Sequence, residues 1–338
     1  MTFSTPAQTN ASAMPKRENP RREDLRVLIC TSPKAGTGGG REGIAHLVEA
    51  LKALNIPTEV TTDIKRVRDV SGFGDPSFPH SREPSHVIVS AGGDGTLALI
   101  AQNTPPSTVL MPMPLGTENL LAKHFGFSCQ TDAMIDTLLN GCDTALDAGS
   151  ANGKIFLVMA TCGFDAEVVR AMHLRRRGHI NRFSYAGPIV RTLRHYRFPP
   201  LNVTWFSAEE ALQESNSDHE APHYHECRWA MVFNLPRYAA SLPIEREACG
   251  DDGKLNFYGL KSGSVASGLR YLGGIVTGRH IHWSDVFRQS ITGCRITSPE
   301  SVSYQLDGDY AGRLPLEIRV LPQYIQLRLP PTRPLDRS

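Results

Sequence analysis

The sequence has no long apolar run, no paired cysteine motif and no strong net charge, and each absence excludes a class of protein. No segment reaches the ~18 consecutive apolar residues that a membrane-spanning helix needs. The seven cysteines form no CxxC pair, which favours reduced thiols in a cytoplasmic protein over a disulfide framework. A net charge of +2 is too small to indicate binding to nucleic acid.

The amino-terminal segment has no apolar centre of the kind found in signal peptides. It is rich in Ser, Thr, Pro and Arg, and we expect residues 1–24 to form a disordered tail. Its basic residues could touch an anionic membrane, but a solubilising tail is the favoured interpretation.

The 338 residues are enough for two domains, and the pattern of the sequence changes near residue 146. Before that point, apolar runs such as LRVLIC and HVIVSA alternate with segments of helical spacing such as GIAHLVEALKAL. After it, short β-rich runs are separated by turn residues. We therefore predict an α/β domain with a mainly parallel sheet over residues 25–146 and a β-sandwich over residues 147–330.

The stretch VIVSAGGDGTLALI, Val87 to Ile100, contains the most informative turn. Its glycines follow an apolar strand and precede a helix, where a backbone can approach phosphate groups closely. The start of that helix offers unpaired N–H groups and the positive end of a dipole. Asp94 could hold water or Mg²⁺ there, and Thr96 could donate a hydrogen bond. An isolated Gly-Gly-Asp-Gly can also be only a tight strand-to-helix turn.

Two further turns occupy the same topological position, after an apolar strand and before a helix. They are Ser32-Pro33-Lys34-Ala35-Gly36 and Pro114-Leu115-Gly116-Thr117-Glu118-Asn119. Turns that follow neighbouring parallel strands meet at one edge of the sheet, where α/β proteins bind their ligands. The three turns together predict one phosphate-binding crevice.

Six motifs in this order resemble the diacylglycerol kinase catalytic-domain family, which includes sphingosine kinases, ceramide kinases and bacterial lipid kinases. TSPKAGTGGG resembles the family's first turn, AGGDGTLALI its Gly-Gly-Asp-Gly-Thr signature, and PLGTENLLAKHFG its Pro-x-Gly-Thr-x-Asn turn. CGFDAEVV, GDDGKLNFY and YQLDGD resemble three later elements. The resemblance spans roughly residues 25–330, nearly the whole of the predicted ordered chain.

This resemblance implies an NAD kinase/diacylglycerol kinase-like α/β domain and a C-terminal β-sandwich, with the active site between them and the end of the chain returning to the first domain. It implies binding of ATP and Mg²⁺, with Asp94, Asp307 and Asp309 as metal ligands, directly or through water. The positions that it assigns to the nucleotide are Ser32, Pro33, Lys34, Ala35, Gly36, Thr62, Gly92, Gly93, Asp94, Gly95, Thr96, Leu97, Gly116, Thr117, Glu118, Asn119, Asp307, Gly308 and Asp309.

The resemblance also implies a catalytic base that takes the proton of the acceptor hydroxyl. The resemblance to bacterial lipid kinases makes Asp252 the first candidate for this base. The resemblance to sphingosine kinases makes Asp94 the second. Asp251-Asp252-Gly253 is also a good turn sequence and could be only a hairpin corner. The chain departs from the family pattern at Ser32, Glu118, Leu120 and Asn256.

The predicted function is therefore ATP- and Mg²⁺-dependent transfer of a phosphoryl group to a hydroxyl of diacylglycerol, a sphingoid base or a similar lipid. The alternatives are a kinase of a soluble acceptor such as NAD, and a catalytically silent protein that binds nucleotide or lipid. We expect a cytoplasmic protein that visits a membrane surface to reach its lipid and binds no nucleic acid. A homodimer is an arrangement that the sequence allows.

One more segment, SVASGLRYLGGIVTG (residues 264–278), has apolar residues at helical spacing. They are Val265, Leu269, Leu272, Ile275 and Val276. Such a helix could form one wall of a lipid pocket or could pack in the ordinary way against the core, and the sequence leaves both interpretations open.

Overall fold

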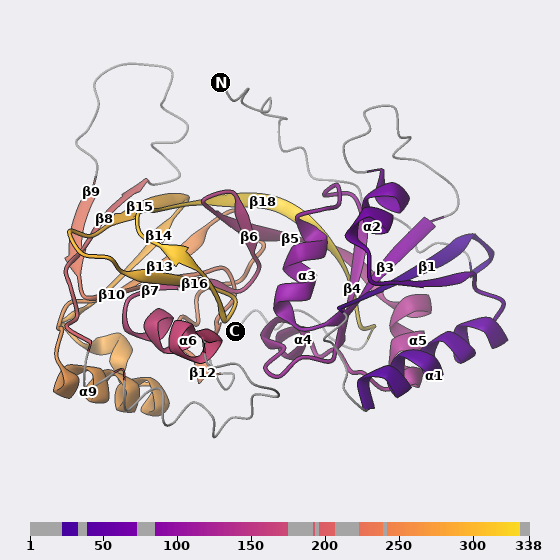
Figure 1. Ribbon diagram of the computed structural model, residues 1–338, viewed down its shortest axis with the longest axis horizontal. Helices are drawn as coiled ribbons and strands as arrows, with labels where there is room; N and C mark the ends of the chain where they lie inside the picture. Colours follow the sequence, from indigo (N-terminus) through magenta and orange to yellow (C-terminus); the bar gives the residue numbers. More distant parts are fainter. Residues whose placement is uncertain are drawn as a thin grey trace, which may run out of the picture.

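The computed structural model describes residues 22–32, 39–72, 85–174, 192, 196–206, 223–238 and 242–331. Figure 1 shows two halves side by side, with helices around a parallel sheet on the right and antiparallel strands on the left. Most of the predicted tail lies outside the described residues. Its last three residues form the short helix η1 (Arg22–Asp24), in which the Arg22 Nε donates a hydrogen bond to the Leu54 carbonyl oxygen at 3.0 Å.

The first half is built on four parallel strands in the order β2-β1-β3-β4. The central residues of β1, β3 and β4 are apolar and are buried in one core, which is typical of a parallel sheet that other elements cover. The strands are β1 (Leu25–Thr31), β2 (Thr58–Thr61), β3 (Ser85–Gly92) and β4 (Val109–Pro114).

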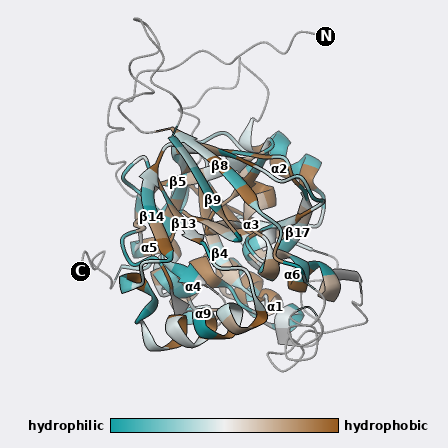
Figure 2. Cartoon of the chain, turned by 90° about the vertical axis from the view of Figure 1, so that its left-hand side faces the viewer, coloured by the Kyte–Doolittle hydropathy of each residue, from teal (hydrophilic) through white to brown (hydrophobic). Residues whose placement is uncertain are grey.

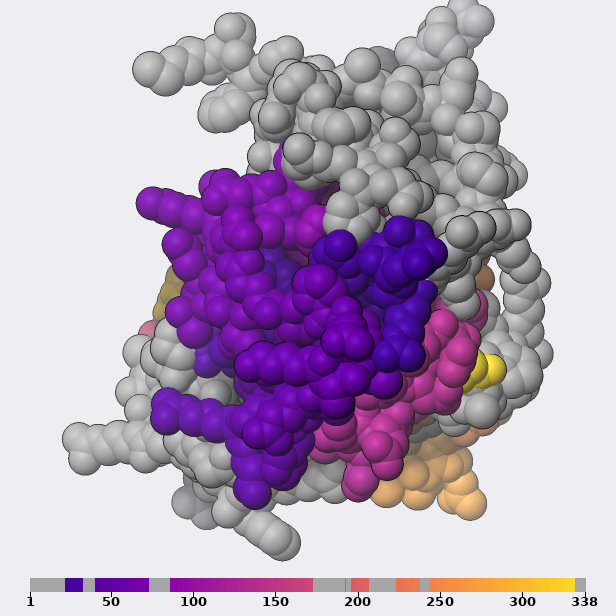
Figure 3. Space-filling model, turned by 90° about the vertical axis from the view of Figure 1, so that its right-hand side faces the viewer, coloured from indigo at the N-terminus to yellow at the C-terminus, as the bar shows by residue number. Residues whose placement is uncertain are grey.

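A helix follows each of these strands, as the alternating pattern predicts. Ile44, Leu47 and Leu51 of α1 are buried at helical spacing, and α1 lies beside α5 on the face shown in Figure 3. The helices of this half are α1 (Gly39–Ala53), α2 (Ile64–Ser71), α3 (Asp94–Ala101), α4 (Leu120–Phe125) and α5 (Thr131–Asn140).

The second half is a sandwich of two antiparallel layers around a separate apolar cluster. One layer has the order β14-β13-β10-β7-β16-β17. Its strands are β7 (Met159–Cys162), β10 (Trp229–Phe233), β13 (Leu255–Leu260), β14 (Val286–Ile291), β16 (Ser303–Leu306) and β17 (Asp309–Arg313). The helices α6 (Phe164–Leu174) and α9 (Val265–Thr277) and the short helix η4 (His280–His282) lie beside it.

The other layer of the sandwich continues the sheet of the first half, through β18, β15, β8 and β9. The sequence pattern does not reveal this continuity. The remaining strands are β5 (Cys142–Ala151), β6 (Lys154–Phe156), β8 (Leu201–Phe206), β9 (His223–Cys227), β11 (Arg237–Tyr238), β12 (Leu242–Pro243), β15 (Gly293–Thr297) and β18 (Leu316–Leu329).

Strand β18 joins the two halves. It pairs in parallel with β4 of the first half and antiparallel with β5 and β15. The boundary predicted after residue 146 falls inside β5, whose residues pair with β18 on both sides of that point. The end of the described chain therefore lies in the sheet of the first half.

The predicted fold class, an α/β domain with a mainly parallel sheet followed by a β-sandwich, is confirmed. Among the described helices, none combines the length and apolar character needed to cross a bilayer.

Candidate active site

Two of the predicted glycine-rich turns meet at the carboxyl edge of the parallel sheet. Strands β3 and β4 are in parallel register with Gly92 opposite Pro114, so the turns that follow them are neighbours. The Leu115 N–H donates a hydrogen bond to the Gly92 carbonyl oxygen at 2.9 Å. The third turn, Pro33 to Gly36, lies outside the described residues, and only Ser32 at its start is described, half-buried after β1.

At this edge, contacts within the protein require glycine at some positions and not at others. A Cβ atom on Gly116 would lie 2.6 Å from the Gly93 Cα, and a Cβ atom on Gly92 would lie 2.4 Å from the Thr96 Oγ1. Gly93 is different, because its added Cβ would meet nothing closer than the Gly116 Cα at 3.4 Å. Its backbone is extended, with φ −99° and ψ −173°. Contacts within the protein therefore do not require glycine at position 93.

Asp94, the aspartate of the signature, holds the start of the next helix. Its two carboxylate oxygens accept hydrogen bonds from the N–H groups of Leu120 at 2.8 Å and Leu121 at 3.1 Å. These N–H groups open α4 and have no partner within that helix. Burial raises the pKa of Asp94, and the two backbone hydrogen bonds oppose that shift. Asp94 thus fixes α3 against α4.

Asn119 closes the second turn with its side chain. The Gly116 N–H donates to the Asn119 Oδ1 at 3.0 Å, and the Asn119 Nδ2 donates to the Gly116 carbonyl oxygen at 2.8 Å. Asn119 has a left-handed backbone, with φ 49°, which asparagine tolerates better than most residues. Beside it, Glu118 forms an ion pair with Lys123 at 3.7 Å.

The turn between β16 and β17 carries Asp307 to the same region. The Asp307 carboxylate accepts hydrogen bonds from the N–H groups of Leu157 at 2.8 Å, and of Val158 and Met159 at 2.9 Å each. Burial raises the pKa of Asp307 to about 7, and the charge of Asp94 acts in the same direction. Asp307 and Asp94 are therefore electrostatic neighbours, although they are far apart in the sequence.

Asp309 approaches the first turn from the same hairpin. A Cβ atom on Gly95 would lie 2.6 Å from the Asp309 Oδ2, so this carboxylate lies against the start of α3. The three acidic residues predicted as metal ligands are thus brought to one edge of the first half. Within the described part of the chain, no three His, Cys, Asp or Glu side chains are close enough together to hold a metal ion by themselves.

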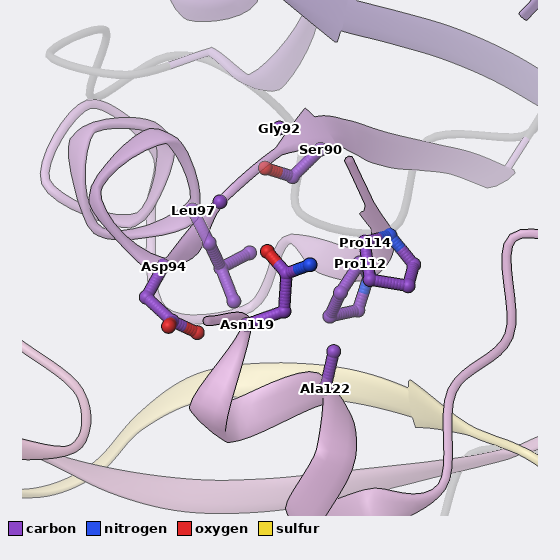
Figure 4. A pocket seen from close by; sticks show the side chains of 9 residues that line it. Ser90, Gly92, Asp94, Leu97, Pro112, Pro114, Asn119 and Ala122 are labelled. Carbon is purple, nitrogen blue, oxygen red and sulfur yellow. The ribbon is translucent and has the colours of Figure 1, made fainter. Parts of the chain in front are cut away.

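A small pocket lies under the first turn, between β3, β4, α3 and α4 (Figure 4). Ser90, Asp94 and Asn119 contribute polar side chains to its lining, and Leu97 and Pro112 contribute apolar ones. The Ser90 Oγ is buried without a hydrogen-bond partner among the described residues, and so is the Thr31 Oγ1 at the end of β1. Buried polar atoms are normally paired, so this edge of the sheet suits a polar ligand.

Asp252 lies in a turn that a buried aspartate holds in place. Asp252 is exposed, and its Oδ1 accepts a hydrogen bond from the Lys254 N–H at 3.0 Å. The Asp147 Oδ2 accepts one from the Gly253 N–H at 2.6 Å, and the Asp147 N–H donates to the Gly250 carbonyl oxygen at 2.7 Å. Burial raises the pKa of Asp147, and the charges of Asp252 and Asp251 add to this shift.

Asn234 connects this turn to the segment that holds Asp307. Its Nδ2 donates to the carbonyl oxygens of Asp147 at 2.9 Å and Leu157 at 2.8 Å. The Leu157 N–H in turn donates to Asp307. The turn of Asp252 and the turn of Asp307 are therefore anchored to each other through three intervening residues.

Sequence analysis missed Asp147 and Asn234. Asn234 directly follows the fully apolar β10. A polar residue immediately after a buried strand is a sequence signal that could have identified it. Asp147 lies inside a strand, and nothing local distinguishes it from an exposed strand residue.

The other predicted nucleotide positions have varied surroundings. Leu97 is buried in the pocket lining, Thr96 is half-buried in the first turn of α3, and Gly308 donates its N–H to the Gln305 Oε1 at 2.7 Å. Thr117 and Thr62 are exposed.

Comparison with protein families shows two matches that together cover most of the chain. Residues 26–151 match the diacylglycerol kinase catalytic domain. Residues 158–329 match the YegS C-terminal NAD kinase beta sandwich-like domain. The two matches meet between β5 and β7, close to where the sequence pattern changes.

Individual relatives extend over both halves. A diacylglycerol kinase of Mycobacterium tuberculosis (strain H37Rv) is 26% identical over 319 residues, which are 92% of this chain and 97% of that protein. A diacylglycerol kinase of Bacillus subtilis (strain 168) is 22% identical over 250 residues, 72% and 78% of the two chains. The crystal structure of a diacylglycerol kinase from Bacillus anthracis str. Sterne has a TM-score of 0.61 at 18% identity and covers 90% of this chain and 97% of its own.

Proposed function

The chain belongs to the diacylglycerol kinase catalytic-domain family, and on that premise we propose that it is an ATP- and Mg²⁺-dependent lipid kinase. It transfers the γ-phosphoryl group to a hydroxyl of diacylglycerol, a sphingoid base or a similar lipid. The observation that supports this most directly is the meeting of the turn at Gly93, the turn at Gly116 and the hairpin of Asp307 at one edge of the parallel sheet.

The first turn supports nucleotide binding because it has what phosphates require. The N-terminus of α3 supplies N–H groups and the positive end of a helix dipole. The Cβ position of Gly93 points into the gap between the two turns, toward Gly116 and Asn119, and contacts there do not require a glycine. The hydroxyls of Ser90 and Thr31, which have no hydrogen-bond partner among the described residues, add two polar atoms at the same edge. These groups would orient the triphosphate and neutralise charge that develops during transfer.

Mg²⁺ fits this edge when phosphate oxygens supply most of its ligands. Asp307 already accepts three backbone hydrogen bonds and Asp94 accepts two. Their carboxylate oxygens are therefore not free to supply most of the ligands of a metal ion. Asp309 lies at the start of α3 with an exposed carboxylate. We assign Asp309 as the acidic residue nearest to a phosphate-bound Mg²⁺, with Asp94 and Asp307 contributing through water.

The structure favours Asp252 over Asp94 as the general base. Both oxygens of Asp94 are held by α4, whereas Asp252 is exposed and accepts hydrogen bonds from the Lys254 N–H and the Cys249 thiol, both within three residues of it in the sequence. Asp252 would accept the proton of the acceptor hydroxyl as that oxygen bonds to the γ-phosphorus and the bond to the departing ADP breaks. Asp147 and Asn234 would keep its turn in position relative to the phosphate site.

The test is a transfer assay with purified protein, Mg²⁺ and γ-labelled ATP. Diacylglycerol, sphingosine, ceramide, monoacylglycerol and NAD are offered separately, the lipids in mixed micelles. Asp252→Asn is expected to lower kcat by about 10²- to 10⁴-fold, the usual contribution of a general base. Asp251→Asn changes an exposed carboxylate in the same turn and is the matched control.

The outcomes distinguish the proposal from its alternatives. Label in a lipid that is lost in Asp252→Asn and kept in Asp251→Asn supports a lipid kinase and names its acceptor. Label only in NAD would instead indicate a kinase of a soluble acceptor on the same fold. Binding of ATP with no transfer to any acceptor would indicate a silent binding protein.

A further inference from the structure

Helix α9 exposes three of its large aliphatic side chains and buries two of its glycines. Val265, Leu269 and Val276 are 43%, 57% and 67% exposed. Gly268 and Gly274 are buried. An amphipathic helix on a protein surface normally has the opposite arrangement. The apolar residues that the sequence predicts to line a pocket or pack in a core are therefore largely on the outside.

The packing of Trp283 explains why the glycines face inward. A Cβ atom on Gly274 would lie 2.3 Å from the Trp283 ring, so this ring lies directly against the helix backbone. Tyr271 and Ile275 fill the rest of the buried face. With these residues occupying the inward face, Val265, Leu269 and Val276 are left outside the core.

The exposed side chains form one line along the helix. Val265, Leu269, Leu272 and Val276 follow one another at intervals of four, three and four residues, which places them on the same face. Leu272 is half-buried and packs against the core at the edge of this line. In Figure 2, α9 runs along the lower edge of the molecule. We call Val265, Leu269, Leu272 and Val276 the aliphatic ridge.

The charges around the aliphatic ridge are mainly positive. Helix α9 contains no Asp or Glu. Lys261 precedes it and Arg279 follows it, both exposed, and the Arg246 Nη2 lies 3.7 Å from where a Cβ atom on Gly278 would be. In the middle of the helix, Arg270 lies over the Trp283 ring, 4.3 Å from its centroid.

The acidic residues near this face are engaged by arginines. Asp285 forms an ion pair with Arg270, and both Glu245 and Glu247 form ion pairs with Arg288. Arg288 compensates only one of its two glutamates, but Lys261, Arg246 and Arg279 outnumber the carboxylate that is left, so the local charge is positive. Apolar residues between exposed cations match the composition of a membrane interface, where acyl chains lie beneath anionic headgroups.

We propose that the aliphatic ridge of α9 docks the protein on an anionic membrane surface. The ridge inserts among the outer acyl carbons while Lys261, Arg246 and Arg279 lie at the headgroup level. The link between this docking and catalysis rests on the proposed lipid kinase function, because a kinase of membrane lipids must reach them from the bilayer surface. The docking itself rests on the geometry and charge of α9.

The experiment is co-sedimentation of the full chain with vesicles of phosphatidylcholine alone and of phosphatidylcholine with phosphatidylglycerol. The test variant is Leu269→Asp/Val276→Asp. The matched control, Val60→Asp/Leu99→Asp, makes the same two changes at positions of 46% and 54% exposure in the first half. Leu269→Ser/Val276→Ser removes the aliphatic groups without adding charge, so it separates loss of insertion from electrostatic repulsion.

The wild type and the control are expected to bind the vesicles that contain phosphatidylglycerol, more weakly as salt rises. The Asp variant is expected to lose at least about tenfold in vesicle partitioning, because two inserted aliphatic groups are lost and two repelled charges are added. The Ser variant is expected to lose roughly threefold to tenfold. Phosphorylation of a detergent-dispersed lipid is expected to stay unchanged in all variants.

Several results would overturn the proposal. One is equal partitioning of wild type and the Asp variant, and another is no binding of the wild type to either vesicle. A third is a wild-type dimer in analytical ultracentrifugation that the Asp variant converts to a monomer, because the ridge would then face a second copy of the chain. If no lipid is phosphorylated, the proposed function fails, but the sedimentation result still decides the docking proposal.

Discussion

Gly93 and Gly116 face each other across two turns, yet only Gly116 is required by contacts within the protein. A methyl group on Gly116 would meet the backbone of Gly93, so Gly116→Ala is expected to lower the free energy of unfolding by roughly 1–3 kcal/mol. Gly93→Ala has room and an ordinary backbone. It is expected to change stability by no more than about 1 kcal/mol but to weaken ATP binding at least about tenfold, because its methyl group would fill the gap between the two turns that we propose hold the phosphates.

Denaturant unfolding and calorimetric titration with ATP measure the two effects separately. If Gly93→Ala bound ATP as tightly as the wild type, the glycine-rich turn would be only a strand-to-helix connection, and the phosphates would have to bind elsewhere.

Asp307 makes stability depend on pH in a direction unlike that of most surface carboxylates. Its folded-state pKa is raised to about 7 from an ordinary value of 3.8. Between these two values the folded state holds the proton and the unfolded state does not, so stability falls as pH rises from about 4 to 7 and then levels off. In the Asp307→Asn variant this component of the slope is expected to disappear.

The measurement is the melting temperature of wild type and Asp307→Asn from pH 4.5 to 8 in EDTA, which keeps divalent metal ions out of the comparison. Parallel profiles for the two proteins would show that Asp307 does not titrate in this range.

At the scale of elements, β5 carries two buried carboxylates, Asp147 and Asp143, which we expect to differ in their effect on catalysis. Asp147 accepts hydrogen bonds from the Gly253 N–H of the Asp252 turn and from the Gln323 N–H of β18. Asp147→Ala would leave both donors unpaired, at a cost of roughly 1–3 kcal/mol each. It is also expected to lower kcat about tenfold or more because Asp252 loses its fixed position.

Asp143 provides the control on the same strand pair. It forms a buried ion pair with Arg328 of β18, with the Arg328 Nε 2.7 Å from the Asp143 Oδ1. Asp143→Ala should destabilise the protein by about 3–5 kcal/mol but keep kcat wherever the protein is folded. If both variants lost the same factor in kcat at equal folded fraction, Asp147 would stabilise the fold only and would not position Asp252 for catalysis.

At the scale of the whole molecule, β18 makes the two halves depend on each other. It is the hydrogen-bonded neighbour of both β4 and β5, so a fragment of residues 22–157 would expose two unpaired strand edges and part of its core. We expect this fragment not to unfold cooperatively in circular dichroism. The same fragment joined by a flexible linker to residues 316–331 is expected to recover a cooperative transition. Cooperative unfolding of the shorter fragment would show that the first half is independent of β18.

The continuity of the sheet also explains where sequence analysis reached its limit for the fold. Alternation of strands and helices predicted the parallel sheet, and short β-rich runs predicted the sandwich. Both patterns report local backbone conformation and burial, which neighbouring residues largely determine. That β18 would pair with a strand some 200 residues earlier is a property of the assembled chain: no local pattern contains it, and only the family resemblance led us to expect that the chain end returns to the first half.

The same division applies to the candidate site. The sequence by itself determined which turns follow buried strands, because glycine, proline and apolar runs leave local signals, and it identified Asp94, Asp252, Asp307 and Asp309 through motifs. Only the tertiary structure decided what these residues contact. Asp94 holds N–H groups 26 and 27 positions away, and Asp307 holds N–H groups about 150 positions away. Only the tertiary structure showed that Asp147 and Asn234 join the two turns and that α9 presents its aliphatic ridge outward. These facts depend on which surfaces meet when the chain is packed, and burial and hydrogen bonding between distant segments are fixed only at that stage.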